Sequence, residues 1–209
     1  MSRRRKRIVA NVAGGLADAS AVPYDALMAE RTPKPKPVTA EWLMRAAAYY
    51  IERYASSTGN LRKVLRRKVM RRALALGEAP EQYESLVEST VVRMTELGLL
   101  DDRAYAAARV SSLRRRGTST TMTKAKLIGK GLSREIVDET LSRDETEEAA
   151  AAAAYARRRR FGPHRNPDRG DRRDKEIAAM VRAGFAMRLA VAAVDGQLGG
   201  DERASPDDI

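Results

Sequence analysis

The sequence predicts an all-α protein made of tandem three-helix repeats that form an elongated, curved molecule. Leu, Val, Ile, Met and Ala recur at helical rather than strand spacing along most of the 209 residues. Ser, Thr or Asp, which cap helix starts, precede the apolar stripes, and glycines, which end helices, follow them. The same layout returns about fifty residues further along the chain, which is typical of a repeat architecture.

Composition and turn residues divide the chain into five expected segments. Residues 1–38 are expected to be a disordered basic arm, because its alternating Pro and Lys cannot form a helix. Three repeats follow at 39–98, 99–142 and 143–195, the last with a flexible Gly- and Pro-containing loop near 162–171. Residues 196–209 are expected to be a disordered acidic tail.

The first repeat begins at Thr39, which is a helix cap with Glu41 in the first turn, and its helix runs to about Ala55. A second helix is predicted from about Gly59 to Leu74, and a third over about 81–97. The second helix carries many cations and no acid. Since no acid stands four residues away, we expect these charges to be available to an external anion. They are Arg62, Lys63, Arg66, Arg67, Lys68, Arg71 and Arg72.

The second repeat has the clearest signals. Gly98 is expected to end the preceding helix, and Asp101 or Asp102 to cap the next, which ends near Gly117. One of the four residues 118–121 should cap a short basic helix that ends at Gly131. Ser133 should cap a third helix over about 134–141.

The third repeat opens with acids at 144–148, followed by an alanine run. Arg157 to Arg160 complete that helix, where cations favour the dipole. Helices over 172–183 and 185–194 complete the repeat, separated by Gly184. Gly117 and Gly131 stand at the same offset from Gly170 and Gly184, which supports the repeat.

The formal net charge of +12 favours a polyanionic partner such as nucleic acid. Each unit resembles a helix-turn-helix in outline, and stacked units would present their basic middle helices as an interrupted ribbon. Because the basic stripes lack the Asn and Gln that discriminate adenine, contact with phosphates is the safer assignment. The candidate contacts are Arg62, Lys63, Arg66, Arg67, Arg71, Arg114, Arg115, Arg116, Lys124, Lys126, Lys130, Arg172 and Arg173.

Catalytic and metal-binding patterns are missing from the sequence. His164 is the single histidine and has no second ligand nearby, and no Gly-rich phosphate loop ends in Gly-Lys-Ser/Thr. The chain has no cysteine and no apolar run of membrane-spanning length. We therefore expect a cytoplasmic monomer that is not an enzyme, has no cofactor or metal, and does not bind membranes.

The central stretch resembles the signature of the RecX regulatory proteins. The matching residues are 98–102 (GLLDD), Tyr105, the Arg-Arg-Gly at 115–117 and the Lys-Gly-Leu at 130–132. The tyrosines at 49–50 and the basic residues 61–68 resemble the first unit of the same family. The resemblance implies a modulator, mostly an inhibitor, that binds the RecA recombinase and its filament on DNA. It also implies restraint of strand exchange, ATP hydrolysis and co-protease activity in DNA repair and the SOS response.

The alternative interpretation is a free-standing DNA-binding or architectural protein without a recombinase partner. In the RecX-like interpretation the DNA contact should not depend on sequence and should include single- and double-stranded forms, whereas sequence-selective retention of duplex DNA would favour the alternative. If the middle helix of the first repeat makes this contact, reversing Arg62, Arg66 and Arg67 to Glu should weaken binding while helix content stays native.

Overall fold

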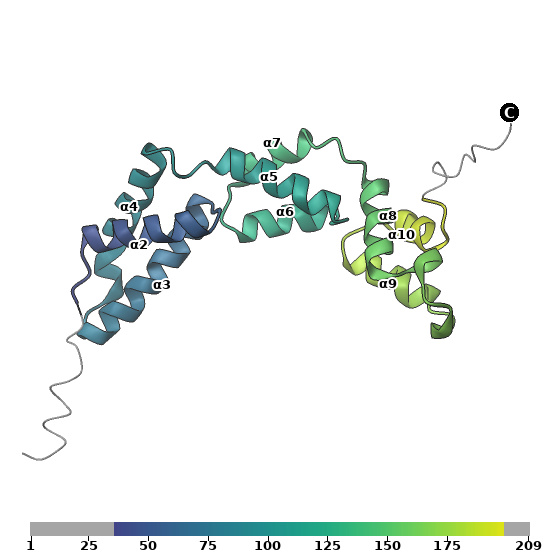
Figure 1. Ribbon diagram of the computed structural model, residues 1–209, viewed down its shortest axis with the longest axis horizontal. Coiled ribbons are helices and arrows are strands. Elements are labelled where there is room, and N and C mark those ends of the chain that lie inside the picture. Colours follow the sequence, from purple (N-terminus) through teal and green to yellow (C-terminus); the bar gives the residue numbers. More distant parts are fainter. Residues whose placement is uncertain (1–35, 199–209) are drawn as a thin grey trace, which may run out of the picture. The chain divides into compact units, whose positions relative to one another are not determined.

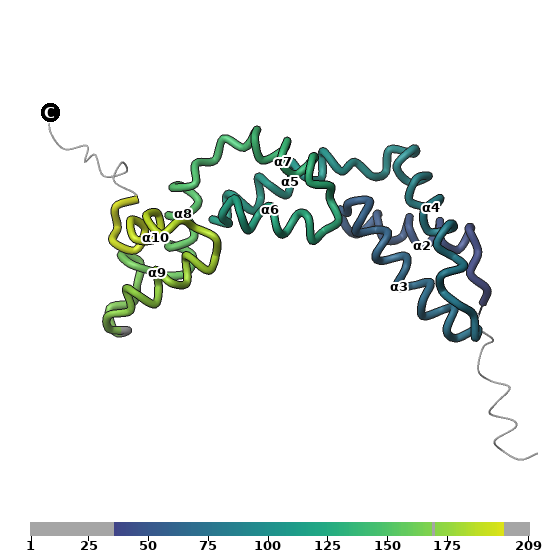
Figure 2. Tube along the Cα trace, turned by 180° about the vertical axis from the view of Figure 1, so that it is seen from behind, coloured from purple at the N-terminus to yellow at the C-terminus, as the bar shows by residue number. Residues whose placement is uncertain are grey.

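A computed structural model of the chain describes residues 36–198, and for Arg169 only the backbone. This part of the chain is all helical and contains no strand, which confirms the predicted fold class. Residues 1–35 of the predicted arm and 199–209 of the predicted tail lie outside the described residues. Figures 1 and 2 show the helices from opposite sides, in consecutive groups of three.

The first group consists of α2 (Ala40–Arg53), α3 (Thr58–Leu76) and α4 (Glu84–Glu96), with a short 3-10 turn at Pro80–Tyr83. Thr39 accepts a hydrogen bond from the Trp42 amide at 3.2 Å and so caps α2, as predicted. The three helices bury one cluster of aliphatic side chains. It includes Leu43, Ala47, Leu61, Leu65, Val69, Val87, Val91 and Met94.

The second group consists of α5 (Asp102–Arg115), α6 (Thr120–Gly129) and α7 (Arg134–Ser142). Asp101 caps α5 by accepting from the Ala104 amide at 2.9 Å, and Ser133 caps α7 through the Ile136 amide at 3.3 Å. Ser119 is the cap of α6 among the four candidates at 118–121. A smaller core joins the three helices, and it contains Ala106, Val110, Leu127, Leu132 and Val137.

The third group consists of α8 (Glu148–Arg159), α9 (Arg173–Arg182) and α10 (Met187–Val194). Its core contains both small and bulky side chains, because the alanine face of α8 packs on Ile177, Met180 and Phe185. Two 3-10 turns, Gly162–His164 and Pro167–Arg169, form the connection for which the sequence predicts a flexible loop. Glu176, which is 5% exposed, accepts from the Gly162 amide at 2.8 Å and anchors this connection to α9.

Neighbouring groups are joined by a contact that occurs twice. Ser57 caps α3, and its hydroxyl also donates to the Lys130 carbonyl oxygen at the end of α6 (2.5 Å). The next residue, Thr58, donates its amide and hydroxyl to the two carboxylate oxygens of Asp102 at 2.8 and 2.7 Å. We call this set of residues the first clasp.

The second clasp repeats this arrangement between the second and third groups. Ser119 caps α6 and donates to the Ala183 carbonyl oxygen at the end of α9 (2.6 Å). Thr120 donates its hydroxyl to Glu148, in the first turn of α8, at 2.6 Å. Each clasp therefore links the start of one middle helix to the first helix and the middle helix of the following group. These bonds contribute to the shared face that single small units require.

Candidate nucleic-acid interface

The basic helix α3 is partly neutralised by its neighbour α4. Arg62 donates to Glu88 at 2.5 Å, and Arg66 binds both Glu84 and Glu88. The hydrogen bond from Arg66 lowers the pKa of the Glu84 carboxyl below its ordinary value. The expectation that all cations of this helix are available is therefore wrong for Arg62 and Arg66. The acids that balance them are distant in sequence and adjacent in space.

Other cations on α3 face solvent. Arg67 and Arg71 are exposed, and within residues 36–198 neither makes an ion pair. Lys63 is exposed as well, and its ammonium group donates to the Gly129 carbonyl oxygen at 3.0 Å. The first group therefore presents a narrower cationic surface than its composition suggests, centred on Arg67 and Arg71.

Arg114 requires a correction, because its side chain is only 1% exposed. Its guanidinium donates to Asp144 and to Glu148, both at 2.7 Å, and to the carbonyl oxygens of Thr118 (2.9 Å) and Thr146 (2.7 Å). All three of its nitrogens are thus directed at partners inside the protein. Arg114 ties the end of α5 to the segment that leads into α8, so it cannot contact an external anion in this conformation.

The remaining candidates of the second group lie at the surface. Lys124 is ion-paired with Asp138 at 2.5 Å. Four others are exposed and make no ion pair among the described residues: Arg115, Arg116, Lys126 and Lys130.

In the third group, Arg173 forms a two-pronged ion pair with Asp195, with nitrogen–oxygen distances of 2.7 and 2.8 Å. This bond raises the pKa of Arg173 and lowers that of Asp195. Arg172 is exposed. The sequence pattern assigns the four arginines at 157–160 to the helix dipole. In the structure all four side chains are also exposed. Their uninterrupted run is a signal of an anion-binding surface that the candidate contacts did not include.

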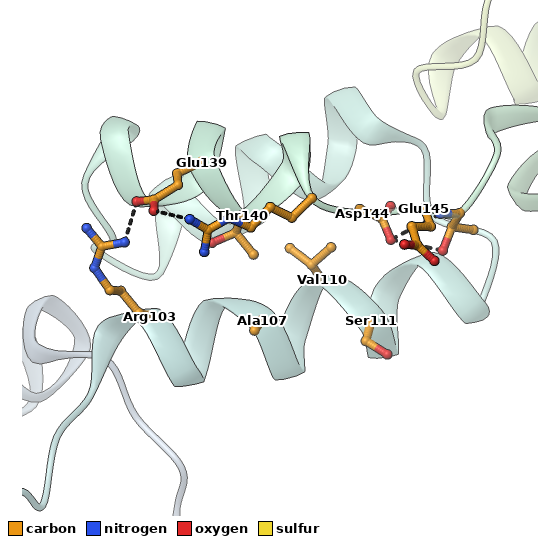
Figure 3. A pocket seen from close by; sticks show the side chains of 10 residues that line it. Arg103, Ala107, Val110, Ser111, Glu139, Thr140, Asp144 and Glu145 are labelled. Carbon is orange, nitrogen blue, oxygen red and sulfur yellow. Dashed lines mark hydrogen bonds and ion pairs between the residues drawn. The ribbon is translucent and has the colours of Figure 1, made fainter.

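A surface cavity of about 500 Å³ lies between α5 and α7 (Figure 3). Glu139 on its wall binds both Arg103 and Arg143, and Val110 and Ala107 lie between the two ends. Asp144 at the other end is held by Arg114. Because these charges are satisfied within the protein, the cavity offers no obvious group for chemistry, and we assign no ligand to it.

Metal-binding clusters and membrane-spanning helices are both absent from the part of the chain that the structure describes. Residues 36–198 hold no group of three or more His, Cys, Asp or Glu side chains that could bind a metal ion. His164 lies exposed in a 3-10 turn. No helix among these residues is both long and apolar enough to cross a bilayer.

Comparison with known proteins identifies the family. The model of the second three-helix domain of RecX matches residues 101–141, which span the second group of helices. The regulatory protein RecX of Myxococcus xanthus is 36% identical over 171 residues, covering 79% of this chain and 91% of that protein. The chain belongs to the RecX family.

Two further RecX proteins extend the comparison. The RecX of Agrobacterium fabrum is 33% identical over 149 residues, which cover 71% of this chain and 79% of the relative. A RecX of Thermus thermophilus is 35% identical over 99 residues, which cover 47% of this chain and 69% of the relative. No solved structure matches this chain. The resemblance to RecX proteins predicted from the sequence is thus confirmed.

Proposed function

We propose that this RecX-family chain is a cytoplasmic, non-enzymatic regulator that binds RecA and its DNA filament and restrains recombinase, ATPase and co-protease activity. It would act as a monomer in DNA repair and the SOS response, without cofactor, metal or membrane. The name of its relatives gives the regulatory class. The partner is inferred from the family resemblance and from the charge of the exposed surface.

The observation that carries the nucleic-acid part of the proposal is the recurrence of exposed, unpaired cations in each group of helices. Examples are Arg67 and Arg71 in the first, Lys126 and Lys130 in the second, and Arg172 in the third, none of them ion-paired within residues 36–198. Unpaired surface cations can bind phosphates along a nucleic acid, whereas cations already paired with carboxylates would first have to break those pairs.

Purified RecA provides the direct test. Adding the full chain should lower DNA-dependent ATP hydrolysis, strand exchange and co-protease cleavage. Electron microscopy of the same mixtures should show the protein along or at the ends of filaments. If all three activities and the filaments are unchanged at concentrations that saturate DNA binding, the proposed regulation of RecA is wrong.

The structure changes the choice of variant for this test. Reversing Arg62 and Arg66 to Glu would set new carboxylates against Glu84 and Glu88, so it would disturb the packing of α3 on α4. Replacing Arg67 and Arg71 by Gln instead removes exposed charge that has no internal ion pair among the described residues. This double variant should weaken filament binding with native helix content. Arg45→Gln on α2 is the control, since it removes one exposed cation that is already paired with Glu41 at 3.2 Å.

The alternative, a DNA-binding protein without a recombinase partner, is supported by the same surface charge. Selective retention of one duplex sequence in the absence of RecA would favour it. Uniform, salt-sensitive binding to all sequences would count against a sequence-reading regulator.

A further inference from the structure

A dense group of cations surrounds the end of α8 and the start of α9. Arg157, Arg158, Arg159 and Arg160 are consecutive and exposed, and Arg172 and Lys175 across the connection are exposed as well. Within residues 36–198 none of these six makes an ion pair. Like charges this close repel one another, and a polyanionic ligand would relieve that repulsion.

Part of this group lines a small cavity of about 170 Å³. It is lined by Phe161, Glu176 and five cationic side chains. The cationic residues are Arg159, Arg160, Arg165, Arg172 and Lys175. The guanidinium of Arg159 lies 5.6 Å from the centre of the Phe161 ring. The cavity thus has a cationic lining with one aromatic wall.

The single acid in the lining is already committed. Glu176 accepts from Arg165 at 2.8 and 2.7 Å and from the Gly162 amide at 2.8 Å. These bonds leave the cations at 159, 160, 172 and 175 without a carboxylate among the described residues. Glu176 and Arg165 therefore act as a scaffold that orders the connection, while the other four cations stay available.

Arg160 gives an independent reason to assign a function to this cavity. Its backbone has φ 59° and ψ 51°, and no other non-glycine residue in 36–198 has a positive φ. It ends α8, where glycine is the favoured residue because a Cβ is disfavoured in this conformation. At the matching ends of α3, α5, α6 and α9 the chain has Gly77, Gly117, Gly131 and Gly184, all with positive φ. An arginine in a strained position that lines a cationic cavity points to selection for its side chain.

We propose that this cavity in the third group binds a phosphate group of the nucleic-acid backbone, with Arg159, Arg160, Arg172 and Lys175 as its contacts. Guanidinium groups match phosphate oxygens in a two-pronged geometry. The cavity admits a group of phosphate size and is too small for a folded protein segment. This proposal rests on the nucleic-acid part of the proposed function and extends it, and its test needs no recombinase.

Arg160→Gly is the decisive variant, because it separates folding from binding. Glycine removes the backbone strain, so the thermal unfolding midpoint should equal or exceed that of the wild type. Binding of the full chain to a labelled single-stranded oligonucleotide, followed by anisotropy, should nevertheless weaken several-fold. The slope of log K against log salt should fall in magnitude by less than about 0.7, the value for one complete phosphate contact, because three cations of the cavity remain.

Arg157→Gln is the matched control, since it removes one exposed charge from the same helix but does not line the cavity. It should change affinity and slope much less than Arg160→Gly does. Equal effects of the two variants would show that only net charge matters, and would overturn the site. An unchanged oligonucleotide affinity of Arg160→Gly would also overturn the site. This holds whether or not that variant binds less well to DNA-free RecA or to inorganic phosphate.

A second variant, Arg172→Gln with Lys175→Gln, approaches the same cavity from α9. Combined with Arg160→Gly it should reduce the salt slope further. If oligonucleotide affinity falls in these variants but RecA activity is still restrained, the phosphate site stands and the proposed coupling to RecA needs revision. If the wild-type chain makes the phosphate contact but has no effect on RecA, only the regulatory proposal is contradicted.

Discussion

Gly59 and Gly131 allow the first and second groups of helices to approach closely at the first clasp. A Cβ on Gly59 would collide with the Gly131 carbonyl oxygen, and one on Gly131 would lie 2.8 Å from the Gly59 Cα. Gly131 also has φ 83°, a conformation that costs other residues roughly 1–2 kcal/mol. Gly131→Ala should therefore lower the free energy of unfolding in urea titrations by at least about 1 kcal/mol.

Gly129 is the control for this prediction. It is helical, and a Cβ there would meet nothing within 4 Å. Gly129→Ala should be neutral or stabilising by up to about 1 kcal/mol. Equal losses in the two variants would mean that close approach at Gly131 is not the cause.

Arg114 should be a stability residue rather than a binding residue. Arg114→Met keeps much of the aliphatic volume but leaves Asp144 and Glu148 without their cationic partner. Breaking a buried ion pair by removing one partner costs about 3–5 kcal/mol, and the partial exposure of Glu148 should place this case near the lower end. The adjacent, exposed Arg115→Met should change stability by no more than about 0.5 kcal/mol. Thermal unfolding of both variants distinguishes these roles.

The contact between α3 and α4 should contribute to acid sensitivity. The pKa of Glu84 is lowered, mainly by its hydrogen bond from Arg66, so the carboxylate is stabilised in the folded state. This contribution is present above the ordinary pKa of 4.5 and is lost as pH falls through the lower folded value. Because both side chains are nearly half exposed, the effect should be small. Glu84→Gln should be less stable than wild type at neutral pH, and the difference should shrink in acid unfolding curves.

The two clasps should couple neighbouring groups of helices. Thr58→Val and Thr120→Val each remove a hydroxyl that donates to a carboxylate, while the shape of the side chain is kept. Hydrogen bonds to charged groups contribute about 1.5–3 kcal/mol, so the free energy of unfolding of each variant should fall by up to this amount. Since the units of a repeat protein depend on their interfaces, the thermal transition should also broaden. Thr58→Ser retains the hydroxyl and should restore both the stability and the sharp thermal transition. If Thr58→Ser is as unstable as Thr58→Val, the hydrogen bond is excluded as the cause.

Several helix starts and ends were predictable from the sequence, because the residues that cap a helix are its neighbours in the chain. Thr39, Ser133 and the glycine ends of α5 and α6 stand where the pattern places them. Long-range pairing was not predictable by the same means. Asp102 was one of two candidate caps, but the structure gives the cap to Asp101 and uses Asp102 in the first clasp. Arg66 and Arg114 were assigned to a ligand, since their partners lie 18 and 34 positions away.

The whole molecule combines a net charge of +12 with internal ion pairs that already engage several of its cations. Binding to single-stranded DNA should therefore depend steeply on salt but less steeply than the charge alone suggests. If about six phosphates are contacted, the slope of log K against log salt is about −4. Anisotropy titrations with oligonucleotides of different sequence should give the same slope and similar affinities. The free energy of unfolding should change much less over the same salt range, since its main sources are the apolar cores. A slope near zero would show that the unpaired cations do not meet phosphates, and strong differences between sequences would point to base contacts instead.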